Sequence, residues 1–521
     1  MSVNKKIIVS VILILLSSLS GCALFSRTEF SLISAVVDDD SGFPSIQISF
    51  NTTDKITLTL INPNSEILFS DIYYRGLHKA TAYIEDYRID PTSGKYTVRA
   101  YDKNDNLIFE DELIFEDRNP SIIEVDEHWW MDNDNYVLVG LTMTLTNPSD
   151  LPVYPYTADV QIDNTASSVP TLPSVILPHQ SDNVNCFVFL DDISSGENTL
   201  EITLKNKERD EIATYSSSVI PIENTPNLIF SWSYGGSNYL KLPDVEFLYE
   251  YYSNLDRFVL EDYAAYIFDV YDDQYMDMVV ERLLSLTDAT KDTDIINFVA
   301  AFVQKLQYAE DDENDSTCEY PRYPIEMLKD KQGDCEDKAM LAADILDIIG
   351  HNVSLLRLPN HMAVGVHLDE NASVYDYYIE EYYFLETTGT RGFLGKVPDE
   401  YKDITNVTVH PISNRPILIH NWKNATRLTG TDGSDFIKMR ILVENLGRKS
   451  ASNFEIRGAF YSQENVGFNQ ETALISYLAG GDKKIVDLKV DVPQTFTTTL
   501  KTKIYLNNEM VHEKESTDTF P

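Results

Sequence analysis

The sequence has little cysteine, with only Cys22, Cys186, Cys318 and Cys335 among its 521 residues. None of them forms a CxxC motif, and none stands at zinc-ligand spacing from a histidine, which argues against a structural zinc site. A glycine-rich phosphate loop is also missing, which argues against nucleotide chemistry. We therefore expect neither a metal nor a cofactor.

Positive charge is scarce as well. The chain carries 41 lysines and arginines against 83 aspartates and glutamates, for a formal net charge of −42. Such a surface repels phosphate backbones, so we expect no nucleic-acid partner. With 43% apolar and 24% charged residues, the composition is that of a folded protein. A chain this long exceeds what one hydrophobic core supports, which predicts several domains.

No apolar run is long enough to span a bilayer, which takes about 20 residues. An apolar run at 7–16 follows two lysines, a pattern typical of a signal peptide. It leads into LSGC at 19–22, which resembles a prokaryotic lipobox; the alternative is a plain secretory signal with a chance cysteine. We predict that 1–22 is a lipoprotein signal peptide and that Cys22 carries the lipid. The mature protein would then be lipid-anchored on the extracytoplasmic face of the cell membrane.

The remaining cysteines are odd in number once Cys22 is lipidated, so at least one thiol has no intramolecular partner. A bridge between Cys186 and Cys318 would have to cross domains, and we expect both to be unbridged. The acidic segment 310–316 lacks the spacing of an EF-hand loop and is predicted to be a solvated loop rather than a calcium site.

Three segments alternate apolar and polar residues over short runs, as β-strands do. The fragments LINPN (60–64), LTNPS (145–149) and LVENLG (442–447) form a weak internal repeat, each at a strand end. Blocks of this size and pattern predict β-sandwiches of the immunoglobulin type. We assign these all-β domains to 23–117, 118–225 and 405–521.

Residues 226–404 differ, because apolar residues recur there at helical spacing in 244–286, 292–309 and 335–349. Gly350 suits the position that ends the last helix. The period then changes to two in 353–358, 361–368 and 375–388, which predicts an antiparallel sheet and an α+β domain. The many tyrosines of 249–275 could form a ligand platform, but their helical spacing favours a packing surface.

Cys335 opens the helix at 335–349, after Gly333 and Asp334, and Asp334 is a suitable N-cap. A helix N-terminus favours a thiolate by only about 0.3–1 kcal/mol. The acidic neighbours at 334, 336 and 337 oppose that effect. The helix end alone therefore cannot activate this thiol, and we expect a nearby imidazolium to do most of the work, as in cysteine–histidine ion pairs.

His361 is the best candidate for that imidazole, because it opens the strand at 361–368. His367 shares its face but lies about 20 Å further along the strand, and we expect it to be structural. Glu386 ends the next strand, and a hairpin can return it to the start of 361–368. A carboxylate there can orient the second ring nitrogen of His361.

These segments together resemble the transglutaminase-like superfamily, which has a papain-related fold. The resemblance covers 226–404 and rests on YPIEMLKDKQGDCEDKAMLAADILDIIG, then NHMAVGVHL, then YYFLETT and GFLGKVP. It is greatest to microbial, notably archaeal, versions with GDCEDKA around the nucleophile. It implies that Cys335 is the nucleophile, His361 the base and Glu386 the orienting acid, although the family's usual acid is aspartate.

The resemblance implies acyl transfer on a peptide or glutamine-type amide, by a protease or amidase if water resolves the thioester and by a crosslinking transferase if an amine does. Its partner would be a protein or peptide substrate. The Cys335 N–H is one natural oxyanion donor, and Gln304 or Tyr308 could supply another. The alternative is a non-catalytic surface adhesion or scaffold protein that binds proteins or glycans. The complete cysteine, histidine and acid set favours the enzyme.

Overall fold

The computed structural model describes residues 28–255, 257, 263–268, 270–311, 320–368, 376–389, 392–412, 415–429, 434–493 and 497–520. The predicted signal peptide with Cys22, most of the acidic segment 310–316, and Cys318 lie outside these residues. The chain divides into two compact units. One holds the residues up to Glu127 and Asn133–Ile222, and the other holds His128–Asp132 and the residues from Glu223 onward.

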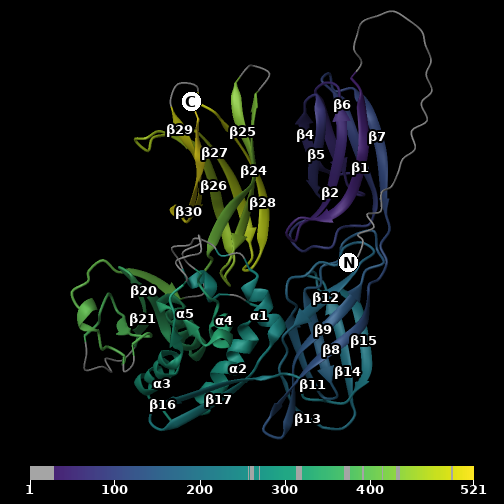
Figure 1. Ribbon diagram of the computed structural model, residues 1–521. Helices are drawn as coiled ribbons and strands as arrows, with labels where there is room; N and C mark the ends of the chain where they lie inside the picture. The colour runs from purple at the N-terminus through teal and green to yellow at the C-terminus, as the bar shows by residue number, and fades with distance from the viewer. Residues whose placement is uncertain are drawn as a thin grey trace, which may run out of the picture. The chain divides into compact units, whose positions relative to one another are not determined.

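The first unit begins with two sheets that form a β-sandwich (Figure 1). One sheet has the order β1-β2-β5, and the other has the order β4-β3-β6-β7. Their strands are β1 Phe30–Asp39, β2 Pro44–Thr52, β3 Ile56–Ile61, β4 Ile67–Tyr73, β5 Gly76–Tyr83, β6 Gly94–Asp102 and β7 Leu107–Phe115. Alternate residues of β2 and β3, such as Ile48 and Leu58, are fully buried between the sheets. This is the inward and outward alternation of a sandwich core.

A second pair of sheets follows in the same unit. One sheet has the order β12-β9-β13 with β8 also paired to β9, and the other has the order β11-β10-β14-β15. The strands are β8 Ser121–Asp132, β9 Asn135–Thr146, β10 Thr157–Ile162, β11 Thr165–Pro170, β12 Ser181–Cys186, β13 Leu190–Ile193, β14 Asn198–Lys205 and β15 Glu211–Val219. Cys186 is a free, buried thiol, as predicted, and burial raises its pKa to about 12.

The second unit ends in another sandwich, with sheets β24-β25-β28 and β27-β26-β29-β30. The strands are β24 Leu418–Thr429, β25 Asp435–Asn445, β26 Ala451–Tyr461, β27 Gly467–Leu478, β28 Lys483–Asp491, β29 Thr498–Leu506 and β30 Glu509–Phe520. Met439, Ile441 and Val443 of one sheet pack with Ile456 and Phe460 of the other. The sequence prediction of β-sandwiches around a mixed central region is confirmed.

The central region opens with the hairpin β16 Asn227–Ser233 and β17 Ser237–Pro243, and then becomes helical. Its helices are α1 Glu246–Ser253, the 3₁₀ turn Tyr263–Tyr266, α2 Asp273–Leu284, α3 Asp292–Lys305, α4 Pro324–Asp330 and α5 Cys335–Ile349. The two-residue strands β18 Gln307–Tyr308 and β19 Gln332–Gly333 pair in parallel. They tie the end of α3 to the residues that precede α5.

An antiparallel sheet of order β22-β21-β20-β23 completes the region. Its strands are β20 Asn352–Leu358, β21 His361–His367, β22 Tyr383–Leu385 and β23 Thr408–Ile412. Helix α5 packs on β20 and β21. An apolar cluster gathers Leu356, Ala363 and Phe384 with partly buried residues from the segments before and after β22. Helices followed by an antiparallel sheet give the α+β arrangement predicted from the change of period (Figure 1).

Several local predictions differ from the structure. The helical pattern of 244–286 is divided into α1 and α2, and the strand predicted over 375–388 is reduced to β22. Glu380 adopts a left-handed φ of 51° in a turn beside the Ile379–Tyr382 bridge, which interrupts that strand. Strand β23 lies beyond residue 404, where we placed the end of the α+β domain, yet it pairs with β20.

The tyrosines of 249–275 mostly support packing, since Tyr252, Tyr266 and Tyr275 are almost completely buried. Within the described residues, no helix combines the length and apolar character needed to cross a bilayer.

Candidate active site

The candidate nucleophile lies at the first position of α5, where the sequence placed it. Asp334 is the N-cap, and its N–H donates to the Asp337 carboxylate at 3.3 Å. Gly350 ends the helix in the left-handed conformation, with φ 103°. Gly333 is required just before the helix, because a Cβ there would lie 2.5 Å from an Asp337 oxygen. The GDC motif thus combines close packing, a cap and a thiol in consecutive residues.

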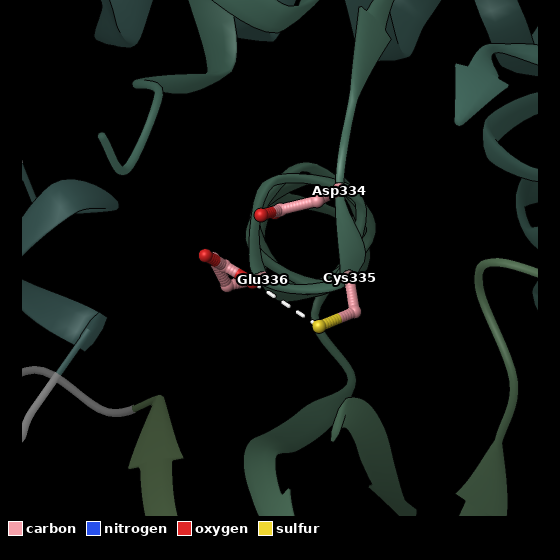
Figure 2. A group of neighbouring side chains, drawn as sticks. All are labelled: Asp334, Cys335 and Glu336. Atoms are coloured by element: carbon pink, nitrogen blue, oxygen red, sulfur yellow. Dashed lines mark hydrogen bonds between the residues drawn. The ribbon is translucent and has the colours of Figure 1, made fainter. Parts of the chain in front are cut away.

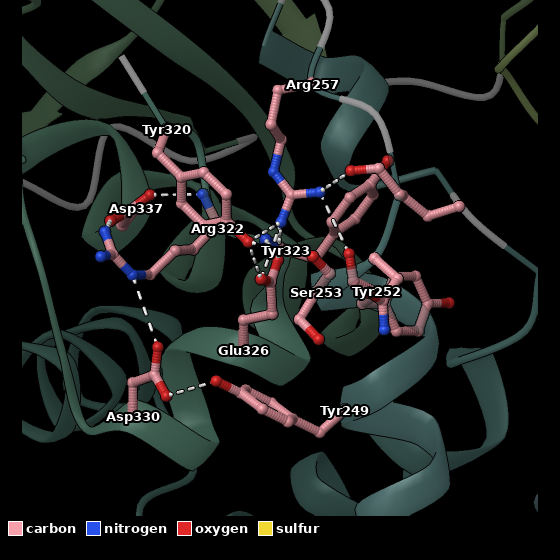
Figure 3. A network of polar contacts seen from close by, with 12 residues as sticks. Tyr249, Tyr252, Ser253, Arg257, Tyr320, Arg322, Tyr323, Glu326, Asp330 and Asp337 are labelled. Atoms are coloured by element: carbon pink, nitrogen blue, oxygen red, sulfur yellow. Dashed lines mark hydrogen bonds and ion pairs between the residues drawn. The ribbon is translucent and has the colours of Figure 1, made fainter. Parts of the chain in front are cut away.

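Buried ion pairs fix the start of α5 against the preceding segment (Figure 3). The Arg322 guanidinium contacts Asp337 at 2.8 Å and Asp311 at 3.1 Å, and its backbone N–H donates to Asp337 at 2.7 Å. Nearby, Arg257 pairs with Glu326 of α4 at 2.6 Å. Removing one partner of such a buried pair typically costs about 3–5 kcal/mol. The Arg322 contacts hold the start of the helix that begins at Cys335, and the Arg257 pair holds the preceding α4.

His361 and Glu386 form a buried hydrogen-bonded pair. In the sheet, Val364 pairs with Leu385 and Val366 with Tyr383, so the antiparallel register returns Glu386 toward the start of β21. The His361 Nε2 lies 3.1 Å from Glu386 Oε2, and both side chains are less than one tenth exposed. The hairpin argument made from the sequence is therefore matched by this geometry.

Glu386 is held as a carboxylate. Its Oε1 accepts hydrogen bonds from the Thr388 N–H at 2.8 Å and the Thr388 hydroxyl at 2.6 Å. Burial opposes the charge, but hydrogen bonds from His361 and Thr388 outweigh it and hold the pKa of Glu386 at about 2. A charged acceptor makes His361 Nε2 the donor, which leaves Nδ1 as the basic nitrogen. The Tyr401 ring stacks on His361 with centroids 4.6 Å apart and an interplanar angle of 5°.

Cys335 lies beside His361, because its sulfur accepts a hydrogen bond from the backbone N–H of Met362, the next residue of β21. The sulfur also lies 3.1 Å from Glu336 Oε2 (Figure 2). Burial raises the pKa of the Cys335 thiol far above its usual value, and the Glu336 and Asp334 carboxylates raise it further. The thiol is therefore protonated at neutral pH, as a donor to Glu336. This differs from the cysteine–histidine ion pair expected from the sequence, because burial and the acidic neighbours disfavour the thiolate.

One group among the described residues offers several potential metal ligands in one place. Atoms of Asp334, Cys335 and Glu336 lie within 4.8 Å of one another (Figure 2). The three residues are consecutive at a helix start, and the thiol hydrogen bond to Glu336 accounts for one of these approaches. The grouping therefore does not by itself indicate a metal.

Gln304 is placed differently from the sequence expectation. It projects from α3, and its amide Nε2 donates to the carbonyl oxygens of Glu386 at 2.8 Å and Gly392 at 3.0 Å. An amide nitrogen carries two N–H groups, so neither remains for an oxyanion. In this geometry Gln304 fixes the backbone of Glu386 instead of donating to a substrate.

Tyr308 remains as the candidate for a second hydrogen-bond donor to an oxyanion. Its ring is about half exposed, and it lies close enough to the thiol for the charge of Cys335 to act on it. Burial, together with negative charge at Cys335 and Asp334, raises the pKa of Tyr308 to about 12. The hydroxyl therefore keeps its proton at neutral pH and can donate it in a hydrogen bond.

The sequence reasoning missed Thr388, Tyr401 and Lys338. Lys338 is buried one turn after Cys335, donates to the Leu306 carbonyl at 2.8 Å, and has its pKa lowered to about 8 by burial, against the effect of Glu386. Thr388 had a local signal, since a carboxylate commonly accepts hydrogen bonds from the backbone N–H and the hydroxyl of a residue two positions further on. Tyr401 had no signal, because its ring meets His361 only through the fold.

Fold and site together define a multidomain protein, mostly of β-sandwich sheets, with a small helical central region that carries a Cys335, His361 and Glu386 group. No protein-family model matches the chain, and no curated protein matches it.

Solved structures give distant similarities. A transglutaminase from red sea bream aligns at 8% identity over 73% of this chain and 80% of that chain, with a TM-score of 0.19. A β-glycosidase from Bacteroides vulgatus aligns at 12% identity over 38% of this chain and 25% of that chain, with a TM-score of 0.13. Latent PorU from Porphyromonas gingivalis aligns at 6% identity over 94% of this chain and 33% of that chain, with a TM-score of 0.17. At such low scores these similarities support no argument about function.

Proposed function

We propose that the chain is a thiol enzyme that transfers acyl groups from peptide or glutamine-type amides. Cys335 is the nucleophile, His361 the general base and Glu386 the orienting acid. The observation that carries the proposal is the meeting of three segments: the Cys335 sulfur contacts the strand position next to His361, and His361 is hydrogen-bonded to Glu386. Nucleophile, base and orienter in that order are the arrangement that activates a weak nucleophile.

The resting thiol is protonated, so the proposed mechanism is general-base attack and not a preformed ion pair. The Cys335 S–H proton passes to His361 Nδ1 while the sulfur bonds to the substrate carbonyl carbon. Protonated His361 then gives that proton to the leaving nitrogen, the C–N bond breaks and a thioester remains. Water or an amine attacks the thioester, loses a proton to His361, and the Cys335 thiolate leaves and regains a proton from His361.

Two donors suit the oxyanion of the tetrahedral intermediate. The N–H of Cys335 is at the first helical position and has no partner within the helix. The Tyr308 hydroxyl is the second, because it stays protonated and lies close enough to Cys335 for the two groups to interact electrostatically. Glutamate in place of the family's usual aspartate is compatible with this scheme, since Thr388 fixes the longer carboxylate.

The test uses an activated ester that reports acylation of any thiol enzyme, followed by a glutamine-containing protein with a fluorescent amine. We expect a burst of ester cleavage with a covalent acyl group at Cys335, found by mass spectrometry. Cys335→Ala should abolish the burst, and His361→Ala and Glu386→Gln should slow it by about 10²–10⁴-fold. His367→Ala is the matched control, because His367 ends the same strand and bonds the Glu381 carbonyl.

Incorporation of the fluorescent amine would identify a transferase, and peptide cleavage or amide hydrolysis would identify a hydrolase. Turnover that survives Cys335→Ala contradicts the proposal. A wild-type chain without any acyl intermediate would favour the adhesion or scaffold function instead.

We also propose that the protein is lipid-anchored through Cys22 on the extracytoplasmic face of the membrane, with proteins or peptides as its substrates. The support is the signal-like pattern of 1–22, which lies outside the described residues. Cys22→Ser should abolish fatty-acid labelling and release the protein from the membrane fraction; a labelled Cys22→Ser chain would contradict the anchor.

A further inference from the structure

Glu336 has an unusual place for an acidic residue in the first turn of a helix. Such residues commonly stabilise the helix N-terminus from its solvent side. Glu336 is instead 6% exposed, and its Oε2 lies 3.1 Å from the Cys335 sulfur (Figure 2). A buried carboxylate in contact with the candidate nucleophile is not required by the scheme above, in which His361 transfers the proton and Glu386 orients His361.

The contact favours one protonation state of the thiol. A carboxylate accepts a hydrogen bond from S–H but repels S⁻, so Glu336 stabilises the thiol against the thiolate. The Met362 N–H acts in the opposite direction, because it donates to the sulfur. Titratable groups around the sulfur come from several elements: Asp334 and Glu336 at α5, Tyr308 of β18, His361 of β21, Glu386 after β22, and Tyr401.

We propose that Glu336 is a positioning residue that holds the Cys335 thiol protonated and turned away from His361 until a substrate occupies the site. This inference rests on the proposed function. When the acyl substrate displaces the contact, the S–H hydrogen bond moves from Glu336 Oε2 to His361 Nδ1, and the sulfur keeps its proton until attack. No bond to carbon forms in this step. The arrangement protects an exported thiol from oxidants and alkylating agents between turnovers, since the thiolate is the reactive form.

The experiment is the pH dependence of iodoacetamide alkylation in the full chain, with Cys335 read separately by mass spectrometry of its peptide. Glu336→Gln keeps the shape of the side chain and removes its charge. We expect the midpoint of the alkylation profile to fall by about one pH unit and the rate at pH 7 to rise about tenfold. A rate within about twofold of wild type would overturn the proposal.

Asp334→Asn is the matched control, because it removes an equal charge at the same helix start and asparagine caps as well as aspartate. We expect a smaller shift than for Glu336→Gln, since Glu336 contacts the sulfur directly at 3.1 Å. Equal shifts would mean a general field effect and would overturn a specific role. If Glu336→Gln does not fold, Glu336→Asp keeps the charge and withdraws it by one methylene; it should still accelerate alkylation.

Alkylation needs no substrate, so this outcome is separate from that of the proposed function. Absence of an acyl intermediate in the wild type refutes the acyl-transfer proposal, whereas an unchanged profile in Glu336→Gln refutes only the role of Glu336. In an active enzyme, Glu336→Gln should shift the pH profile of kcat/KM to lower pH, which loss of structure alone would not do.

Discussion

At the scale of single residues, the two halves of the candidate site are electrostatically opposed. The half with His361 and Glu386 stabilises a charge, because hydrogen bonds from His361 and Thr388 lower the pKa of Glu386 to about 2 and keep it ionised. Since this pKa lies below the usual value, the pair stabilises the fold above about pH 4.5 and loses its contribution as the pH falls toward 2. The Cys335 half disfavours charge through burial and Glu336. In the mechanism that we propose, proton transfer depends on the substrate changing the surroundings of the sulfur.

Asparagines of the internal repeat hydrogen-bond the backbone where strands end. Asn147 is fully buried, donates to the carbonyls of Leu151 and Ile176, and accepts from the Ser149 N–H. Asn445 repeats the pattern: it donates to the carbonyl four residues on, at Lys449, and accepts from the N–H two residues on. The side chain thus replaces ladder hydrogen bonds where each strand ends.

Replacing either asparagine by alanine leaves several buried backbone groups without partners. Each such group costs about 1–3 kcal/mol, so we expect Asn147→Ala and Asn445→Ala each to lower the free energy of unfolding of their own sandwich by about 2–4 kcal/mol. Hydrogen exchange by mass spectrometry measures this locally. The control is Asn62→Ala in the third copy, whose side-chain amide has its hydrogen bonds, within the described residues, with the exposed Glu66. Equal losses at all three positions would contradict the argument.

Sequence reasoning reached the residues whose roles are local or follow from register. Asp334 as N-cap, Gly350 as helix end, and the approach of Glu386 to His361 all follow from spacing in one or two elements. The role of Gln304 was not accessible, because its two carbonyl partners lie more than 80 residues away and depend on how α3 packs. The Glu336 contact was likewise hidden, since burial and not spacing turns it toward the sulfur.

At the scale of elements, the two sheets of the C-terminal sandwich are joined by a histidine pair. His420 of β24 is fully buried, its Nε2 lies 2.7 Å from the Thr502 hydroxyl of β29, and its Nδ1 lies 2.8 Å from Nδ1 of His512 on β30. Burial, together with the smaller effects of His512 and Lys514, lowers the pKa of His420 to about 3. The contact between His420 and His512 therefore forms only when His420 is neutral.

This pair predicts an acid-sensitive sandwich. The unfolded chain binds a proton at the usual histidine pKa of about 6.5, whereas folded His420 does not until about pH 3, so stability rises with pH across this window and is lost as the pH falls. We expect a loss of about 2–3 kcal/mol between pH 6.5 and 4.5. Hydrogen exchange in β24 and β30, corrected for intrinsic rates, measures it.

His420→Gln should flatten this dependence while lowering the stability at neutral pH. The sandwiches of the first unit provide the internal comparison in the same sample. An unchanged slope in His420→Gln would show that other groups cause any acid sensitivity.

Element boundaries show where periodicity stops being informative. The central sheet takes β23 from beyond residue 404, because pairing with β20 is decided by the topology and not by the local pattern. A short strand such as β22 has too few residues to display a period. The tyrosines and acidic residues before it have the alternating pattern of a strand, but they do not form one. By contrast, α3 and α5 have long apolar periods, and both were predicted within a few residues.

At the scale of the whole molecule, one arginine connects two parts of the second unit. Arg448 follows β25 in the C-terminal sandwich and pairs with Asp273, the first residue of α2. Its guanidinium also lies 5.5 Å from the centre of the Phe268 ring. Asp344 and Asp347 of α5 act on the same guanidinium and raise the pKa of Arg448 against the effect of burial. Arg448 is thus the cation at a cluster of carboxylates that includes the buried Asp344.

We expect Arg448→Met to destabilise the second unit by about 1–2 kcal/mol, because it leaves the part-exposed Asp273 and the carboxyl groups of α5 without their cation. Protection from hydrogen exchange should fall together in α2, in α5 and around β25, while the first unit keeps its protection. Arg440→Met is the matched control: Arg440 lies on β25 and pairs with the half-exposed Asp487, so its loss should cost less than about 1 kcal/mol. Equal effects of the two substitutions would mean that the sandwich is only tethered to the central region. A larger effect of Arg448→Met that reaches α5 would mean that the sandwich stabilises this helix at its C-terminal end, whereas Cys335 lies at its N-terminal end.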